Sequence, residues 1–442
     1  MNRAYAPAMA GPWNAAAART GPTVRMYDMG GIGMLILGVL TAIPVSFVGR
    51  LYIGEVLLGL VGPVAIPLVV TMPGRYGKLA RTLLIAMIIS WIGYIGSDLY
   101  RGTPGFDYLR GWFRWVALIS SYATLAWLGS KNVRYAVFFL IGWCLGTAFY
   151  PLFLANLPIR VWWKFYAGFP TILILAYFAG KFGPTIAAAT MGAVGALSIL
   201  LDSRSMMMTC LVTAGLSLIA GRRKPDARRS ERRLSKSSVV VAVLAIGVCG
   251  AASLFIVEQI GIRYGYADRF ERSNVRRWTN VEIAYEILKQ SPLIGYGSWA
   301  RDPEVARIRD KIVAKQVGKV TRSEAQDDLI IVHSQILQAW VEGGLIGLAF
   351  FVIYGWHLAE KGMRLAAVLP YEPLTPLIIF VLITAAWHFF ASPFSGTSRV
   401  IISVACVLMC YLETGGTTAR VAAPALAPAA PWRRSMAAMP RA

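Results

Sequence analysis

The sequence is short of charged, acidic and histidine side chains. Only 15% of its 442 residues are charged, whereas about 25% are charged in a soluble domain. Its three histidines form no HExxH zinc motif. Its five cysteines all lie within apolar runs, so they indicate neither a disulfide framework nor a metal site. These shortages argue against a soluble domain, a zincin hydrolase and a disulfide-stabilised secreted protein.

Apolar and basic side chains are abundant instead. Hydrophobic residues make up 57% of the chain, and 44 Lys and Arg against 22 Asp and Glu give a formal net charge of +22. A nucleic-acid binder spreads its positive charge over a soluble surface, of which this chain has little. The composition therefore predicts an integral membrane protein whose basic loops face anionic lipids, with no nucleic-acid partner.

Long apolar runs give the predicted architecture. A helix needs about 20 mostly apolar residues to cross the hydrocarbon core, and by that measure the chain has about twelve spans. The predicted spans are residues 30–48, 52–72, 79–97, 112–129, 135–155, 166–181, 184–202, 205–221, 237–257, 335–357, 373–391 and 397–413. The fold class is thus an all-α polytopic membrane protein.

The spans divide the chain into five parts. Residues 1–29 are a predicted disordered cytoplasmic leader, 30–257 hold helices one to nine, 258–334 form one large and partly helical outer loop, 335–413 hold the last three helices, and 414–442 are a disordered cytoplasmic tail. The side assignment follows from the short loops rich in Lys and Arg, because such loops stay in the cytoplasm.

The large outer loop ends at His333, where the tenth predicted span begins. A neutral imidazole can accept a proton from a hydroxyl nucleophile, because its unperturbed pKa of about 6.5 lies near ambient pH. The alternative is an interfacial histidine that hydrogen-bonds a loop carbonyl. His357 and His388 lie within predicted spans, and packing or interfacial anchoring suits both.

Arginines on the same predicted face are candidates for anion binding. Arg204 lies in a polar break between two spans, where its partner is Asp202, a lipid headgroup or an anionic ligand. Residues 263–277 carry five arginines, whose planar forks match phosphate oxygens. Phospholipid headgroups are the alternative partners for that run. Arg110 and Arg114 share a helix face and either join an outer anion site or snorkel to headgroups.

Three motifs resemble those of the O-antigen ligase and polymerase superfamily. The stretch from His333 to Gly347 resembles its signature, in which an outer-loop His, an Asn and a Leu-Gln pair lead into a Glu-x-Gly-Leu-Ile-Gly helix. Counting back from the turn at residues 292–297, Arg277 falls on the family's loop arginine. Arg204, preceded by Ser, matches a Ser-Arg pair that the family places after an earlier span.

The resemblance covers the second half of the chain, since the first half matches only in span number and hydropathy. The sequence departs from the family pattern at Ser334, where Asn is usual, and at Val281, where Trp is common. The first departure affects any hydrogen bond assigned to that Asn, and the second removes a stacking platform.

The resemblance implies a metal-independent glycosyltransferase with no cofactor, at the periplasmic face of the bacterial inner membrane. Its donor would be a glycan on undecaprenyl pyrophosphate, and its acceptor a sugar hydroxyl of lipid A–core in lipopolysaccharide assembly. An O-antigen polymerase and a protein O-oligosaccharyltransferase are the nearest alternatives, because the sequence does not identify the acceptor, the glycan or the oligomeric state. A transporter of lipid-linked glycans is an alternative of another class, which Glu55, Pro63 and Pro67 fit weakly.

The resemblance and the residue chemistry give one hypothesis for the reaction. Arg204 and Arg277, aided by Arg276 or Arg272, would clamp the donor pyrophosphate and stabilise the charge of the leaving group. His333 would take the proton from the acceptor hydroxyl as it attacks the anomeric carbon with inversion. The sequence leaves open whether His333 is the base or a positioning group.

Overall fold

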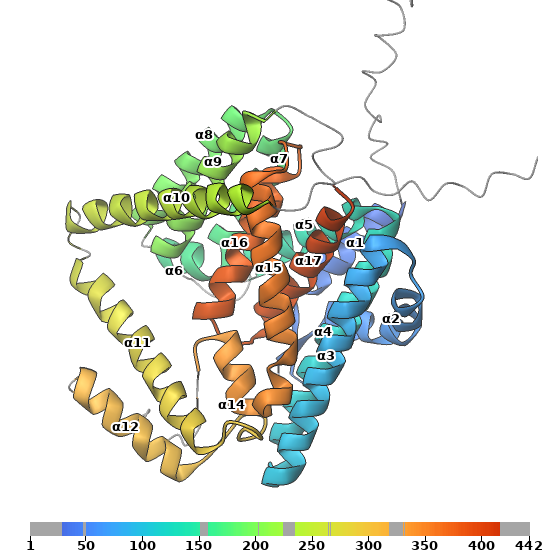
Figure 1. Cartoon of the computed structure of the whole chain (residues 1–442), viewed down its shortest axis with the longest axis vertical. Helices are drawn as coiled ribbons and strands as arrows, with labels where there is room; N and C mark the ends of the chain where they lie inside the picture. The colour runs from blue at the N-terminus through green and yellow to red at the C-terminus, as the bar shows by residue number, and fades with distance from the viewer. Residues whose placement is uncertain are drawn as a thin grey trace, which may run out of the picture.

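The computed structural model describes residues 29–46, 50–150, 158–201, 203–223, 235–263, 265, 267–317, 330 and 332–415. These residues are almost entirely helical (Figure 1). The elements are α1 (Met29–Leu40), β1 (Pro44–Ser46), β2 (Arg50–Tyr52), α2 (Ile53–Val70), α3 (Gly74–Arg101), α4 (Gly105–Lys131), α5 (Val133–Phe149), α6 (Ile159–Trp162), the π-helix η4 (Trp163–Ala167), α7 (Gly168–Gly180), α8 (Pro184–Leu200), α9 (Arg204–Gly221), α10 (Lys236–Arg263), α11 (Ala267–Gln290), α12 (Pro303–Val317), α14 (Gln335–Gly347), α15 (Ala349–Ala367), α16 (Thr375–Ala391) and α17 (Gly396–Glu413). The all-α prediction is confirmed, and the predicted leader and tail lie almost wholly outside the described residues.

Six helices among the described residues are long and apolar enough to cross a membrane, and a seventh span results if α14 and α15 count as one bent pair. Four shorter apolar helices, α1, α5, α8 and α16, have 10–17 residues. These helices suit a multi-pass membrane protein. The figure of twelve spans stays a prediction, as does the cytoplasmic and periplasmic assignment of the loops.

The first predicted span, residues 30–48, is wrong in its second half. Helix α1 ends at Leu40, and residues 44–46 pair with residues 50–52 in an antiparallel hairpin, where Pro44 lies opposite Tyr52. Proline has no backbone N–H for a helical hydrogen bond and pushes the preceding residue toward extended conformations. The apolar run therefore continues beyond the point at which the helix has to stop.

The tenth predicted span, residues 335–357, is also wrong as a single helix. The chain forms α14, then turns by 116° within a break of four residues or fewer and continues as α15. The bend occurs beside Gly344, whose φ of 63° and ψ of −159° are not helical. An apolar run with a Gly-Gly pair is long enough for a span, but it leaves the backbone free to fold back.

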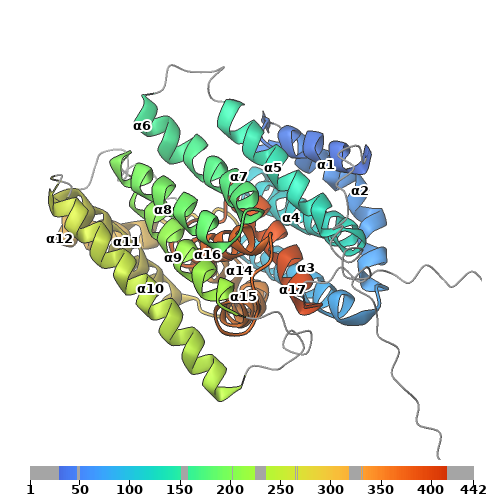
Figure 2. The same cartoon turned by 90° about the horizontal axis from the view of Figure 1, so that it is seen from above.

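Most buried apolar side chains of the described residues belong to two cores, and a small third cluster surrounds Ile199 and Met207. The larger core centres on α3, α4, α15 and α17, and 83% of the apolar window of α17 is buried, against 11% for α10. Figure 2 shows α8, α9 and α10 side by side along one flank, with α10 outermost. The smaller core joins α11, α12 and α14 through residues such as Ile287, Val305 and Val341.

Candidate functional site

The turn at residues 295–297 holds the bend of α14 in place. The backbone N–H groups of Tyr296 and Gly297 donate to the carbonyls of Val341 and Glu342, at 2.7 and 3.0 Å, and Leu345 N–H donates to Leu293 O at 3.0 Å. Both glycines have positive φ, 80° at Gly295 and 84° at Gly297. Such angles strain any residue with a Cβ. The turn therefore acts as a backbone clamp on α14.

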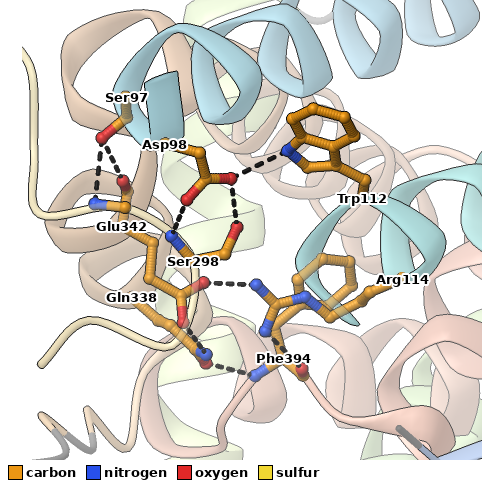
Figure 3. Close-up of polar contacts among 9 residues, drawn as sticks. Ser97, Asp98, Trp112, Arg114, Ser298, Gln338, Glu342 and Phe394 are labelled. Carbon is orange, nitrogen blue, oxygen red and sulfur yellow. Dashed lines mark hydrogen bonds and ion pairs between the residues drawn. The ribbon is translucent and has the colours of Figure 1, made fainter. Parts of the chain in front are cut away.

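Asp98 anchors this clamp to the long helix α3 (Figure 3). Its carboxylate accepts hydrogen bonds from the backbone N–H of Ser298 at 2.5 Å, from the Ser298 hydroxyl at 2.8 Å and from the Trp112 indole at 2.8 Å. The neighbouring Ser97 hydroxyl donates to Glu342 O at 2.8 Å. Asp98 is 2% exposed, and its three donors replace the water that burial removes.

Arg114 and Glu342 form a buried ion pair between α4 and α14, with both side chains 4% exposed. Gln338 donates to the other Glu342 oxygen at 3.1 Å and accepts from Phe394 N–H at 2.7 Å, so the pair is part of a network (Figure 3). The expectation that Arg114 snorkels to headgroups is therefore wrong. The sequence held a signal for this pair, because the acid in the Glu-x-Gly-Leu-Ile-Gly helix needs a basic partner within an apolar segment.

Ser334 fixes the start of α14 next to His333. Its hydroxyl accepts from Leu337 N–H at 3.5 Å as the N-cap and donates to the carbonyl of Phe389 on α16 at 3.1 Å. Serine is a favoured N-cap residue, so it fills the structural role that an Asn would have here. The residue directly after His333 is thereby held between α14 and α16.

His333 itself is an exposed residue, although neighbouring protein atoms shield part of its imidazole from water. Desolvation by the surrounding atoms, and secondarily the positive charge of Arg277, lower the pKa of His333 below its ordinary value of about 6.5. Most of its population is then neutral at pH 7. A neutral imidazole is the form that accepts a proton.

Arg277 lies on α11 and faces Trp387 of α16. Its guanidinium carbon lies 4.9 Å from the ring centroid of Trp387 on α16, and the side chain is half-buried. Burial lowers the pKa of Arg277, although an arginine keeps its charge in proteins. That charge acts on His333 and also on Arg204 at the start of α9. Three side chains from three separate segments thus lie within electrostatic range of one another through Arg277.

The remaining sequence candidates fall outside this cluster or outside the described side chains. Arg272 and Arg276 lie on α11, but their side chains and Asp202 are not among the described residues. His357 Nδ1 lies 3.3 Å from a Glu360 oxygen. The His388 ring stacks on Phe169 with centroids 6.5 Å apart, which agrees with a packing role.

Glu55, which fits a transporter only if it lies free within a span, is instead held in an ion pair. Arg399 donates from Nε and Nη2 to the two Glu55 oxygens, both at 2.6 Å. Glu55 lies in the first turn of α2, and the pair links α2 to α17. A bidentate pair of this kind explains the carboxylate as a structural contact.

An apolar cavity of about 640 Å³ begins beside the His333 segment. One end is lined by Ile336, Phe389 and Phe390, next to the Ser334–Phe389 hydrogen bond, and the other end reaches Met363 and Leu365. Helices α9, α10, α15 and α16 form its walls. A lipid chain is the kind of molecule that such a lining accommodates.

Gln335, which the sequence did not single out, is a further polar group in this region. It is fully buried directly after the cap residue, and neither of its side-chain amide atoms has a hydrogen-bond partner among the described residues. A buried amide without partners is destabilising. The residue lies within the stretch from His333 to Gly347, but its burial depends on how α14 packs.

Comparison with known proteins gives one match. A family model described as O-Antigen ligase matches residues 186–352, from α8 to the first residues of α15. No curated protein and no solved structure matches the chain. The matched segment contains Arg204, Arg277 and His333, together with the clamp and the bend of α14. This match over residues 186–352 supports membership of the O-antigen ligase superfamily.

Proposed function

We propose that this protein is a glycosyltransferase of the bacterial inner membrane that transfers a glycan from undecaprenyl pyrophosphate to a sugar hydroxyl of lipid A–core, with its site facing the periplasm. The family match supports a ligase or polymerase type of activity. The single observation that carries the finer proposal is that the charge of Arg277 lowers the pKa of His333 and also acts on Arg204.

The two arginines suit a donor pyrophosphate. Bringing two positive charges together is unfavourable, and an anion between them converts that repulsion into attraction. Arg204 and Arg277 approach from α9 and α11, so a pyrophosphate between them would receive guanidinium forks from two directions. These contacts would strengthen as negative charge develops on the leaving group, which is how they would accelerate transfer.

The apolar cavity suits the polyprenyl chain of such a donor. Its end at Ile336 and Phe389 adjoins the segment that holds His333, and its volume of about 640 Å³ lies within the membrane-embedded helices. A donor with its pyrophosphate at Arg204 and Arg277 could therefore place its chain among apolar side chains. Burying each CH₂ group there contributes about 0.8 kcal/mol.

His333 suits the role of general base. Its neutral imidazole would take the proton of the acceptor hydroxyl as that oxygen bonds to the anomeric carbon, while the bond from this carbon to the pyrophosphate oxygen breaks. The pyrophosphate would leave with the electron pair of that bond, held by Arg204 and Arg277. Attack from the face opposite the leaving group inverts the anomeric centre.

Transfer by the purified protein tests the proposal. The protein in nanodiscs is incubated with a glycan on undecaprenyl pyrophosphate and with lipid A–core, and we expect a lipid A–core product of increased mass. Elongation of the lipid-linked glycan alone would instead identify a polymerase. Transfer of the glycan to a labelled peptide alone would identify a protein O-oligosaccharyltransferase. Movement of the donor across the bilayer without glycan transfer would identify a transporter.

A further inference from the structure

A second group of basic side chains lies at the start of α4, away from Arg204 and Arg277. Figures 1 and 2 show α14 between α11 on one side and the α3 and α4 pair on the other. Arg110 and Arg114 of α4 both approach the indole of Trp299, which follows the clamp at residues 295–297. Their guanidinium carbons lie 4.1 and 5.8 Å from its ring centroid.

Three hydrogen-bond donors converge on this indole without acceptors. The Nε atoms of Arg110 and Arg114 and the Nε1 atom of Trp299 are all buried, and none has a hydrogen-bond partner among the described residues. Buried donors in native proteins nearly always have partners, because an unmade hydrogen bond costs about 1–3 kcal/mol. Three such donors around one ring indicate a place for the oxygens of a ligand.

The surrounding contacts show that the arrangement is held in place. Trp299 has a φ of 53°, the only positive φ of a non-glycine residue in the described part of the chain. Asp98 holds the preceding Ser298, and Asp107 pairs with Arg301 at 3.3 Å just after it. Backbone strain of this kind persists only where the neighbouring contacts determine the conformation.

The donor cluster is open on one side and lies close to the His333 segment. Arg110 is 26% exposed, whereas Arg114 is 4% exposed and forms the inner wall. Ala300, next to Trp299, accepts a hydrogen bond at 2.9 Å from Ile330 N–H, three residues before His333. The loop that carries Trp299 is thus hydrogen-bonded to the segment that leads into His333.

We propose that Arg110, Arg114 and Trp299 form an acceptor subsite that binds the phosphate or carboxylate of an anionic sugar. Such a group supplies several oxygens to the three donors, whose arginines also pair with the carboxylates of Asp107 and Glu342. The inference rests on the proposed function, because a transferase needs a second substrate on the far side of its base. It goes beyond that function by assigning recognition of the acceptor to three named residues. Two of them, Arg110 and Arg114, lie outside the segment at residues 186–352 that matches the family model.

Binding of glucose 6-phosphate to the purified protein in phosphatidylcholine nanodiscs tests the site by calorimetry. We expect glucose 6-phosphate to bind and glucose not to bind. Arg110→Gln and Trp299→Phe should each weaken binding about tenfold, the usual effect of losing one hydrogen bond to a charged group. Trp299→Phe removes the indole N–H together with the five-membered ring and keeps a smaller aromatic ring at this position.

Arg301→Gln is the matched control, because it removes the pair with Asp107 but none of the three donors. We expect its affinity for glucose 6-phosphate to stay within about twofold of the unaltered protein. An equal loss in Arg301→Gln would mean that the cluster only holds the loop, and absence of binding to the unaltered protein would also overturn the subsite. Loss of binding in phosphatidylglycerol nanodiscs would assign the three donors to a lipid headgroup instead.

Transfer kinetics test the acceptor role separately. With lipid A–core as acceptor, Arg110→Gln should raise the acceptor KM about tenfold and leave the donor KM unchanged. A rise in the donor KM instead, or no rise in either, would overturn the acceptor assignment even if glucose 6-phosphate binds. Failure of the unaltered protein to transfer any glycan would refute the proposed function, whereas the binding measurement would still report on the three donors.

Discussion

The charged side chains on the two sides of α14 are arranged in opposite ways. On the α3 and α4 side, Arg114 faces Glu342, and both are 4% exposed within a network of hydrogen bonds. On the α11 side, Arg277 lies within electrostatic range of a second arginine, Arg204, and of His333, and these side chains are partly exposed. A buried charge needs a buried partner, because a lone charge there is strongly destabilising, whereas like charges brought together are expected where an anion binds.

The difference separates residues that build the site from residues that would act in it. Glu342 lies in the same helix as the segment that follows His333, and the sequence motif alone gives both equal prominence. The structure shows Glu342 facing inward to α4 and His333 facing outward at the beginning of the helix. Substitutions on the α3 and α4 side should therefore change stability, whereas substitutions on the α11 side should change glycan transfer.

Removing the His333 imidazole should have the largest effect on transfer. We expect His333→Ala to lower the transfer rate by about 10²- to 10⁴-fold, the range that a positioned base supplies. The thermal midpoint should stay close to that of the unaltered protein, because the side chain is exposed. His357→Ala is the control, since that histidine interacts with Glu360 within α15 and should keep full transfer. Comparable rates for the two variants would reject His333 as the base.

Breaking the buried pair should have the largest effect on stability. Glu342→Gln leaves the Arg114 charge buried without a compensating carboxylate, and we expect a loss of about 3–5 kcal/mol, seen as a lower thermal midpoint by tryptophan fluorescence. The double variant Arg114→Met with Glu342→Leu should recover much of that loss, because apolar side chains of similar size tolerate burial. An unchanged midpoint in Glu342→Gln would show that the pair is not structural.

Replacing Arg204 or Arg277, on the α11 side of α14, by lysine should have a smaller effect that is specific to donor binding. Arg204→Lys and Arg277→Lys keep the charge but lose the bidentate fork, so we expect the KM for the lipid-linked donor to rise about tenfold, with little change in thermal midpoint. Arg309→Lys on α12, which faces Asp310 at 3.0 Å, serves as the control. Full donor affinity in both test variants would contradict a pyrophosphate clamp.

The pH dependence of transfer should show the smallest effect. Because the pKa of His333 is lowered by desolvation and by Arg277, the neutral base persists below pH 6.5, and kcat/KM should fall only as the pH drops through that lowered pKa. Arg277→Gln removes one of the two causes, so its acidic limb should move to higher pH. A limb that stays in place would mean that Arg277 does not act on the titrating group.

The sequence predicted the helices better than their ends and bends. Twelve apolar runs were identified, and each overlaps a helix of the structure. The errors occur at Pro44 and Gly344, where hydropathy continues through a backbone that leaves the helix. Hydropathy reports which residues avoid water, but it does not report whether the intervening peptide groups keep helical angles.

The candidate site was predicted only in part for a related reason. Local motifs pointed to His333, Arg204 and Arg277, and their mutual proximity stays the basis of a proposal. For Arg114 the sequence suggested an outer anion site or lipid headgroups, but the side chain pairs with Glu342, which lies 228 positions away in the chain. The sequence does not show that the Trp299 indole N–H and the Gln335 amide are buried without partners, because that depends on how the surrounding segments pack.

The amino-acid sequence by itself determined that this is an all-α membrane protein with a family motif, because the free energy of moving apolar side chains into lipid accumulates residue by residue along each run. Only the tertiary structure decided which charges pair, which converge and which buried donors lack acceptors. Those properties depend on distances between side chains from separate helices, and such distances are fixed by the packing of the whole bundle.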